Sequence, residues 1–292
     1  MYKDDGFTKE DSDMLANSEP VVLVGRGGSG TRLLSQLALS LGIFLGNKLN
    51  GSLDSEEWVE DIYRLAISAT SAPGIESGSA QERFWTWQLR KRAKAILRDA
   101  HKSHTDIWGW KLPETILALP QILKAFPNAY VIHLVRHPLT SSWRRTHMTS
   151  RTDNPIGRAV LAAAYKACGY DPENIDRDEP SFHNVLTWTY QVQQAYEVLN
   201  SMVRPDRVLC LRYEDICDSA SAVRDSMSGF LGLGKAGTTC PVEINPERIT
   251  AMPENTLETA KAWSISGEVA TRLGYGYNPL PAKAKHGTGL QQ

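Results

Sequence analysis

A glycine-rich turn is the part of this sequence with the clearest chemistry. Four apolar residues, 21–24, run into the turn Gly-Arg-Gly-Gly-Ser-Gly at residues 25–30, and a segment with helical spacing begins at Thr31. A strand, a turn and a helix in this order aim several backbone N–H groups and the positive end of the helix at one point. That arrangement suits a phosphate or sulfate group. We therefore predict an anion-binding loop formed by Arg26, Gly27, Gly28, Ser29, Gly30, Thr31 and Arg32.

The spacing within this turn limits which compound it binds. Gly25 and Gly30 are separated as in a P-loop, but Thr31 stands where the nucleotide-hydrolysing version has a lysine. That lysine contacts the terminal phosphates of ATP or GTP, so its replacement argues against an ordinary kinase or ATPase. Two alternatives stay open: a small-molecule kinase that uses Mg·ATP, and a catalytically silent nucleotide-binding protein of the same fold.

A second candidate anion site follows the apolar segment 130–135. Arg136 comes directly after this expected strand, and hydroxyl side chains and further arginines follow at residues 140–145. An arginine that leaves the carboxyl end of a parallel strand points into the crevice where α/β sheets bind ligands. A guanidinium fork suits a phosphate better than a lone ammonium does. The alternative is that Arg136 forms a structural salt bridge.

The elements that must position these groups follow from the hydrophobic pattern. Residues 21–24, 130–135 and 207–212 are near-continuously apolar, and helical segments separate them. Such strands indicate a parallel sheet that is covered on both faces. We predict an α/β fold, P-loop-like, with three α/β/α layers and a central mostly parallel sheet. The segment 154–183 is expected to be irregular, and its charged part, 171–180, is either a lid or a solvated excursion.

Length and composition bound the rest. The 292 residues suit a flexible lead-in at 1–19, one domain at 20–280 and a disordered tail at 281–292. The 32 basic and 33 acidic residues give a formal net charge of −1, so charge favours neither a nucleic acid nor a membrane partner. The N-terminus lacks a secretory pattern, no apolar run reaches transmembrane length, and the four cysteines are scattered. A cytoplasmic protein is expected, and the oligomeric state is unknown.

Two anion sites in one crevice fit a nucleotide with a 5′-phosphosulfate and a separate 3′-phosphate, and here the chain resembles a known family. It is similar to the sulfotransferases that use 3′-phosphoadenosine 5′-phosphosulfate (PAPS). The matching motifs occur in the expected order between about residues 20 and 276. They are the 5′-phosphosulfate loop at 28–34, a Lys-x-Pro element at 108–113, the 3′-phosphate segment at 130–145, an Arg-Tyr-Glu-Asp element at 211–216 and Leu-Gly-Tyr at 273–275.

The resemblance implies that PAPS is the donor, that a hydroxyl or amine of a small-molecule or glycan acceptor attacks in line, and that no metal is required. Two departures affect the nucleotide site. The family usually has Lys or Arg where this chain has Gly28, so Arg26 or Arg32 must supply the charge, and we favour Arg26. The family's serine eight positions after the arginine is replaced by Arg144, so Ser142 and Arg144 become candidates for completing the 3′-phosphate site.

The resemblance also implies the catalytic residues. Lys111 is expected to stabilise the departing oxygen, although a lysine beside two tryptophans could instead be a surface residue. The small-molecule cytosolic branch has a catalytic histidine two positions after this lysine, where this chain has Pro113. The chain is therefore closer to the branches with a carboxylate base. Asp54 and Glu57 are equal candidates for that base, and the alternative is that both carboxylates are simply solvated.

Overall fold

A parallel sheet of four strands forms the centre of the fold. The computed structural model describes residues 7–71, 74–102, 107–234, 242, 244 and 251–281. Its strands are β1 (Val21–Val24), β2 (Gly109–Lys111), β3 (Tyr130–Val135) and β4 (Val208–Arg212), in the order β2-β1-β3-β4. All three pairings are parallel. The predicted α/β fold with a central parallel sheet is confirmed.

The strand order explains where the ligand crevice lies. From β1 the chain crosses to β2 on one side, and it then returns to β3 on the other side of β1. The connections after β1 and β3 therefore lead away in opposite directions, which opens a crevice at the carboxyl ends of these two strands. The glycine-rich turn leaves β1 and Arg136 leaves β3 at this edge. The two predicted anion sites thus share one crevice.

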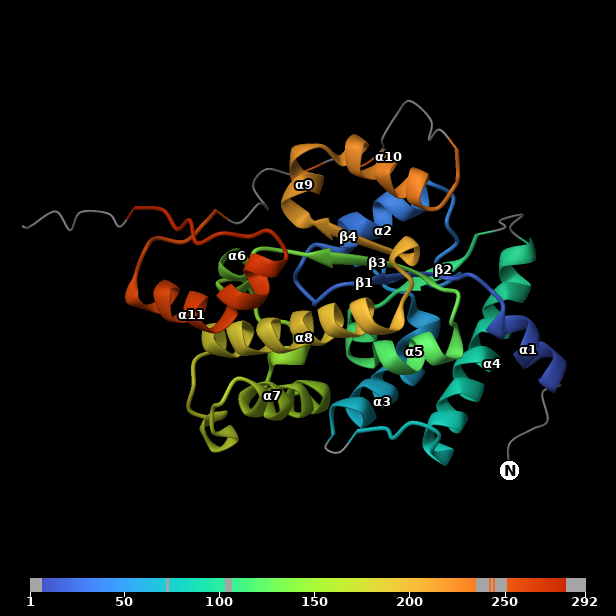
Figure 1. Ribbon diagram of the computed structural model, residues 1–292, viewed down its shortest axis with the longest axis horizontal. Helices are drawn as coiled ribbons and strands as arrows, with labels where there is room; N and C mark the ends of the chain where they lie inside the picture. Colours follow the sequence, from blue (N-terminus) through green and yellow to red (C-terminus); the bar gives the residue numbers. More distant parts are fainter. Residues whose placement is uncertain are drawn as a thin grey trace, which may run out of the picture.

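Helices cover both faces of the sheet, as Figure 1 shows. Valines and leucines of β1 alternate between two cores: Val22 and Val24 face one, and Val21 and Leu23 face the other. This alternation follows from the period of two in a strand. One layer contains α2 (Thr31–Ser40), α9 (Tyr213–Asp218) and α10 (Ala220–Phe230). The other contains α3 (Val59–Thr70), α4 (Ala80–Lys102), α5 (Leu119–Ala125) and α8 (Pro180–Met202).

Three further helices lie around the carboxyl end of the sheet. They are α6 (Pro138–Ser142), α7 (Pro155–Ala167) and α11 (Leu257–Arg272). Figure 1 shows α7 below α8 and α11 at the left-hand end of α8. Short 3-10 helices complete the described chain: η1 (Glu56–Trp58), η2 (Pro113–Ala118), η3 (Met148–Ser150), η4 (Pro172–Asn174) and η5 (Pro205–Arg207).

The prediction of an irregular segment at 154–183 is wrong for residues 155–167, which form α7, and for residues 180–183, which begin α8. Asn154 caps this helix, because its side-chain oxygen accepts the backbone N–H of Ile156 at 3.0 Å. Pro155 occupies the first turn, where its missing N–H costs nothing, and the following residues are rich in alanine. The sequence thus contains an ordinary helix start at this position, with a capping asparagine followed by proline.

The predicted N-terminal lead-in contains a short helix that packs on the domain. Within the expected lead-in, residues 9–16 form α1 (Lys9–Ala16), which is capped by Thr8 and buries Leu15 completely. Asp11 at its start pairs with Lys94 of α4 at 2.5 Å, so this segment is attached to the domain. Residues 1–6 and the tail residues 282–292 lie outside the described chain.

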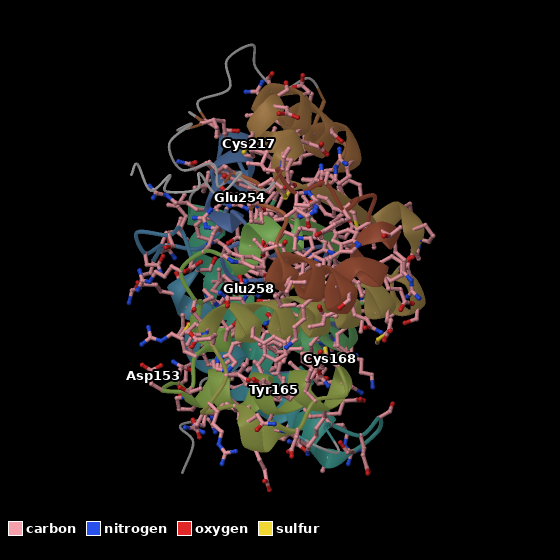
Figure 2. All side chains as sticks on the ribbon, turned by 90° about the vertical axis from the view of Figure 1, so that its left-hand side faces the viewer. Asp153, Tyr165, Cys168, Cys217, Glu254 and Glu258 are labelled. Carbon is pink, nitrogen blue, oxygen red and sulfur yellow. The ribbon has the colours of Figure 1, made fainter. Side chains whose placement is uncertain are left out.

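The cysteines of the described chain carry free thiols. These are Cys168, Cys210 and Cys217. Figure 2 shows Cys168 and Cys217 toward opposite ends of the molecule. Cys240 lies outside the described residues. Within the same ranges, the structure contains no helix of the length and apolar character needed to cross a bilayer.

A substitution at Gly25 tests how tightly the junction between β1 and the glycine-rich turn is packed. A Cβ added there would lie 2.7 Å from the Leu134 carbonyl oxygen. We therefore expect Gly25→Ala to lower the free energy of unfolding by about 1–3 kcal/mol, the usual cost of overpacking. Denaturant unfolding measures this change. The control is Gly229→Ala, where an added Cβ meets nothing within 4 Å on a helix. Equal stability of the two variants would contradict close packing at Gly25.

Candidate functional site

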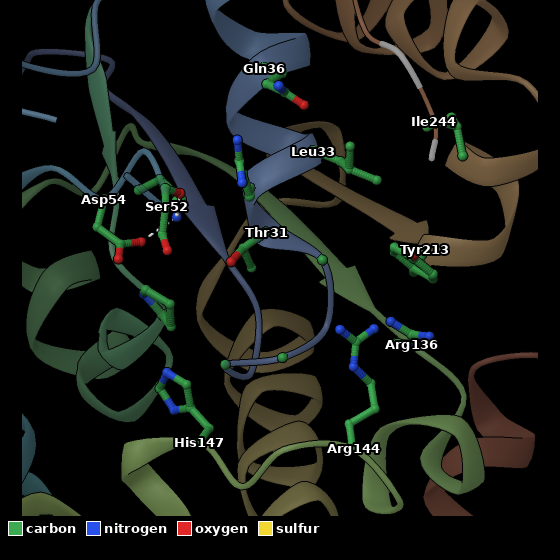
Figure 3. Close-up of a pocket in the computed structure, with 16 residues that line it drawn as sticks. Thr31, Leu33, Gln36, Ser52, Asp54, Arg136, Arg144, His147, Tyr213 and Ile244 are labelled. Atoms are coloured by element: carbon green, nitrogen blue, oxygen red, sulfur yellow. Dashed lines mark hydrogen bonds and ion pairs between the residues drawn. The ribbon is translucent and has the colours of Figure 1, made fainter. Parts of the chain in front are cut away.

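A cavity of about 380 Å³ lies at the carboxyl edge of β1 and β3. Figure 3 shows the glycine-rich turn running across its middle, with Asp54 and His147 on one side and Arg136 and Arg144 on the other. The cavity is lined by Gly27, Gly28, Gly30, Thr31, Arg32, Leu33, Gln36, Ser52, Asp54, Lys111, Pro113, Arg136, Arg144, His147, Tyr213 and Ile244. Most of the predicted site residues therefore converge, whereas Arg26, Ser29, Glu57 and Ser142 do not line it.

Backbone conformation and close packing explain why three positions of the turn are glycine. Gly28 and Gly30 have φ angles of 91° and 93°, a region that side chains rarely adopt. A Cβ on Gly27 would lie 2.2 Å from the ring of His147, and one on Gly30 would lie 2.3 Å from Tyr213. Two rings can therefore press against the turn. α2 begins directly after Gly30, whose carbonyl accepts the Leu33 N–H at 2.9 Å, and the first N–H groups of a helix have no carbonyl partner within the helix itself.

Lys111 and Asp54 form an ion pair at one end of the cavity. Lys111 is the last residue of β2, and its Nζ contacts the Asp54 carboxylate and donates to the Ser52 carbonyl at 2.8 Å. Ser55 attaches this loop to the strand, since its N–H donates to the Lys111 carbonyl at 2.8 Å. Burial lowers the pKa of Lys111, while Asp54 opposes that shift. Lys111, which is expected to stabilise the leaving oxygen, and Asp54, one of the two candidate bases, thus lie side by side.

Glu57, the other candidate base, has a different environment. Its Oε1 accepts the backbone N–H groups of Asn47 at 2.7 Å and Lys48 at 3.0 Å. These bonds close the loop that follows the first βα unit. The two carboxylates that the sequence could not separate are therefore distinguished by position: Asp54 faces the cavity, and Glu57 holds a loop.

Arg136 and Arg144 place two guanidinium groups next to each other at the other end of the cavity (Figure 3). Arg136 is 1% exposed, its guanidinium stacks 4.0 Å from the centre of the Tyr213 ring, and its Nε donates to Thr140 at 3.2 Å. Its Nη1 is buried without a hydrogen-bond partner among the described residues. Burial, and secondly Arg144, lower the pKa of Arg136. Two adjacent cations of this kind attract an anion.

The alternative reading of Arg136 as a salt-bridge residue finds no support in the described ranges, where neither it nor Arg144 pairs with a carboxylate. Ser142 has another partner: its hydroxyl donates to the Pro138 carbonyl at 2.7 Å within α6. Arg144, rather than Ser142, is therefore the residue that the structure places beside Arg136.

Arg26 lies behind the turn instead of in the cavity. It is 2% exposed, and its Nη2 donates to Asn184 at 2.8 Å and to Ser150 at 2.9 Å. Burial lowers its pKa to about 10. Arg32, in contrast, is exposed and lines the cavity. Of the two arginines considered for the missing positive charge, Arg32 is the one that lines the cavity.

Sequence reasoning missed Glu114, an acid buried beneath the cavity. It is 1% exposed, and neither carboxyl oxygen has a hydrogen-bond partner among the described residues. Burial, assisted by nearby Asp54, raises the pKa of Glu114 to about 7. Its Oε1 lies 3.8 Å from Nε2 of His147, whose pKa burial lowers to about 4. Glu114 stands three residues after Lys111, and only its surroundings, which come from distant segments, make it unusual.

The Arg-Tyr-Glu-Asp element and the C-terminal Leu-Gly-Tyr meet next to this cavity. Glu214 accepts the backbone N–H of His137 at 3.1 Å and the hydroxyl of Tyr275 at 2.8 Å. The hydroxyl of Tyr275 also lies 3.2 Å from the Val135 carbonyl. One carboxylate thus connects the ends of β3 and β4 to the C-terminal turn, so these separate motifs form one structural unit.

Comparison with known proteins places the chain in a class. The family model described as "Sulfotransferase family" matches residues 20–236, most of the chain, and this protein belongs to the sulfotransferase family. The match confirms the resemblance inferred from the motifs. The closer likeness to the carboxylate-base branches stays a prediction. No curated protein sequence matches the chain significantly.

Solved structures of sulfotransferases are similar to this chain. The sulfotransferase STF9 from Mycobacterium avium aligns with a TM-score of 0.50 and 12% identity, over 94% of this chain and 81% of that one. The sulfotransferase domain from the curacin biosynthetic pathway aligns with a TM-score of 0.49 and 16% identity, over 91% and 100%. The sulfotransferase domain of the Synechococcus PCC 7002 olefin synthase gives 0.49 and 15%, over 90% and 96%. The first of these likenesses supports the shared fold.

Metal-ligating side chains do not gather in the described part of the chain. Within it, no group of three or more His, Cys, Asp or Glu residues is arranged to hold a metal ion.

Glu114 gives a pH dependence that can be measured. Its pKa is raised from an ordinary 4.5 to about 7, so the protonated folded state is favoured below 4.5 and loses this advantage as pH rises through 7. Glu114→Gln should therefore gain stability relative to the unmodified protein over this range, by about 1.4 kcal/mol for each pH unit. Denaturant unfolding from pH 4.5 to 8 measures the difference.

The control for this experiment is Glu56→Gln, which changes an exposed glutamate of the neighbouring segment. Its stability should run parallel to that of the unmodified protein at every pH. A parallel curve for Glu114→Gln as well would show that the buried carboxyl is not held neutral in the folded state.

Proposed function

We propose that this sulfotransferase transfers the sulfuryl group of PAPS to a hydroxyl or amine of a small-molecule or glycan acceptor. The observation that carries the proposal is the cavity with two separate sets of anion-binding groups. The glycine-rich turn and Lys111 form one set, and Arg136 with Arg144 forms the other. PAPS has an anionic group at each end of its ribose, so one cavity with two such sets suits it. Family membership supports the same donor.

The groups in the cavity fit this nucleotide. The buried, unpartnered Nη1 of Arg136 and the adjacent Arg144 would hold the 3′-phosphate. The turn at 27–31, the start of α2 and Arg32 would hold the 5′-phosphosulfate. When bound, the nucleotide supplies an activated sulfuryl group on a phosphate leaving group. Arg32 takes the part first assigned to Arg26, because Arg26 is engaged elsewhere.

Lys111 is proposed to stabilise the charge on the leaving oxygen. It is 1% exposed, so solvent screens its charge little, and a buried cation stabilises developing negative charge strongly. In the present arrangement its Nζ contacts Asp54 and Ser52. Both partners lie on one loop, and this loop together with β2 fixes the Nζ at the edge of the cavity.

Asp54 is proposed as the base that takes the acceptor's proton. It lines the cavity, and its side chain is 18% exposed, so an acceptor can reach it. Pairing with Lys111 keeps the carboxylate oriented toward the site of transfer. Glu57 is not favoured for this role, since two backbone N–H groups occupy its Oε1. The same proposal includes a small-molecule or glycan acceptor, which acceptor screening tests. It also includes a cytoplasmic location, which cell fractionation tests.

Asp54→Asn and Glu57→Gln separate these two roles. Asp54→Asn should reduce kcat by about 10²–10⁴, the usual contribution of a general base. Glu57→Gln should leave kcat near that of the unmodified protein and lower the melting temperature, since it weakens two loop hydrogen bonds. Sulfuryl transfer from labelled PAPS, with thermal unfolding in parallel, measures both. A larger loss of kcat in Glu57→Gln would reverse the assignment.

Calorimetric titration tests the donor class. The unmodified protein should bind adenosine 3′,5′-bisphosphate, the desulfated product, without added metal and more tightly than Mg·ATP. Arg136→Ala should weaken that binding about 10–100-fold, because it removes charge-assisted hydrogen bonds. The matched control is Arg207→Ala, whose guanidinium stacks 4.1 Å from the Tyr130 ring away from the cavity. Preference for Mg·ATP would favour a kinase, and binding of neither nucleotide would favour a silent protein of this fold.

A further inference from the structure

Asn184 connects the two anion-binding elements from behind the cavity. This residue of α8 accepts a hydrogen bond from Arg26 Nη2 at its Oδ1, at 2.8 Å. Its Nδ2 donates to the carbonyls of Ser142 at 3.0 Å and Arg144 at 3.3 Å. The guanidinium can only donate and the two carbonyls can only accept, so the orientation of the amide is fixed by its neighbours. One side chain thus bridges Arg26 of the glycine-rich turn and the segment that carries Arg144.

Arg26 ties the other end of this connection to the turn. Its Nη1 donates to the Gly27 carbonyl at 3.2 Å, and its Nη2 also contacts Ser150 at 2.9 Å and Thr187 at 3.2 Å. Arg26, Asn184 and their two hydroxyl partners are all buried. Water does not compete with hydrogen bonds in such surroundings, and a buried polar network of this kind rigidifies the elements that it joins.

Arg144 needs such a support. Residues 143–147 lie between α6 and η3 and form neither helix nor strand. Besides the Asn184 bond, the backbone of Arg144 is held by its N–H, which donates to the Ser141 carbonyl at 3.3 Å. The guanidinium groups of Arg144 and Arg136 lie next to each other (Figure 3), and their positive charges repel each other. The repulsion therefore has to be opposed by contacts on the far side of the segment.

We propose that Arg26 and Asn184 form a brace that sets the spacing between the glycine turn and the Arg136–Arg144 pair. The brace makes both ends of a two-headed anion bind at once. Both are positioning residues, because neither lines the cavity. The inference rests on the proposed function in that the two-headed anion is a 3′,5′-phosphorylated nucleotide. Holding the second site at the correct distance raises its effective concentration once the first group is bound.

Asn184→Asp tests the brace with a minimal change. The aspartate keeps an oxygen for Arg26 but loses the two N–H donors, and it places negative charge against the carbonyls of residues 142 and 144. Calorimetry with adenosine 3′,5′-bisphosphate and with adenosine 5′-phosphate gives two dissociation constants for each protein. The dissociation constant of adenosine 5′-phosphate divided by that of the bisphosphate reports what the 3′-phosphate contributes to binding. We expect this ratio to fall about tenfold in Asn184→Asp, with less than about threefold change for adenosine 5′-phosphate.

Further variants distinguish a loss of the brace from a general loss of stability. Arg26→Gln breaks the other end of the brace and should lower the same ratio, and the double variant should lose no more than the larger single loss. Thr189→Val is the control: its buried hydroxyl donates to the Val185 carbonyl at 3.0 Å, on the same helix but outside the brace. It should leave the ratio unchanged while lowering stability.

The outcomes separate the brace from the donor assignment. If the unmodified protein binds neither nucleotide, the proposed function fails, and the brace fails with it. If the unmodified protein favours the bisphosphate but Asn184→Asp and Arg26→Gln keep its full ratio, the brace is overturned and the donor assignment stands. Equal weakening of both nucleotides would also overturn the brace, because it would indicate only a general structural role for these residues.

Discussion

Arg136 and Arg144 repel each other, and the fold nevertheless holds their guanidinium groups side by side. β3 delivers Arg136 to the edge of the sheet, and stacking on Tyr213 fixes its plane. Asn184 holds the backbone of Arg144 from the opposite side. Such an arrangement costs free energy in the absence of a ligand, and a phosphate between the two groups would recover it. Much of the crevice can be understood as the framework that keeps this charge pair in place.

The opposite end of the cavity contains the complementary chemistry. There Lys111 and Asp54 form a partly buried ion pair, and the buried acid Glu114, whose pKa burial raises to about 7, lies nearby. Burial disfavours the charged forms of Lys111 and Glu114, and it strengthens the attraction between Lys111 and Asp54. His147 joins this end to the anion-binding turn, because its ring packs against Gly27 of the turn and its Nε2 lies 3.8 Å from Glu114 Oε1. The two ends are thus chemically distinct but share one turn of the chain.

The sequence predicted those parts of the structure that depend on local pattern. The bounds of β1 and β3 match the prediction to the residue, because β1 is an apolar run that ends at a glycine, and β3 is an apolar run, interrupted only by His133, that ends at an arginine. The start of α7 was equally local and was missed, because the charged residues that follow drew the interpretation toward a loop. The separate environments of Asp54 and Glu57, and the burial of Arg26, were beyond sequence reasoning. Each depends on residues between 9 and 161 positions away in the chain.

A crystal structure of the protein with adenosine 3′,5′-bisphosphate tests the central claim most directly. The account predicts the 5′-phosphate against the backbone of residues 27–32 and close to Lys111, and the 3′-phosphate between Arg136 and Arg144. It also predicts that the Arg26–Asn184 contact is preserved in the complex. A nucleotide bound in the opposite orientation, or one that leaves the two guanidinium groups without a phosphate, would contradict the account.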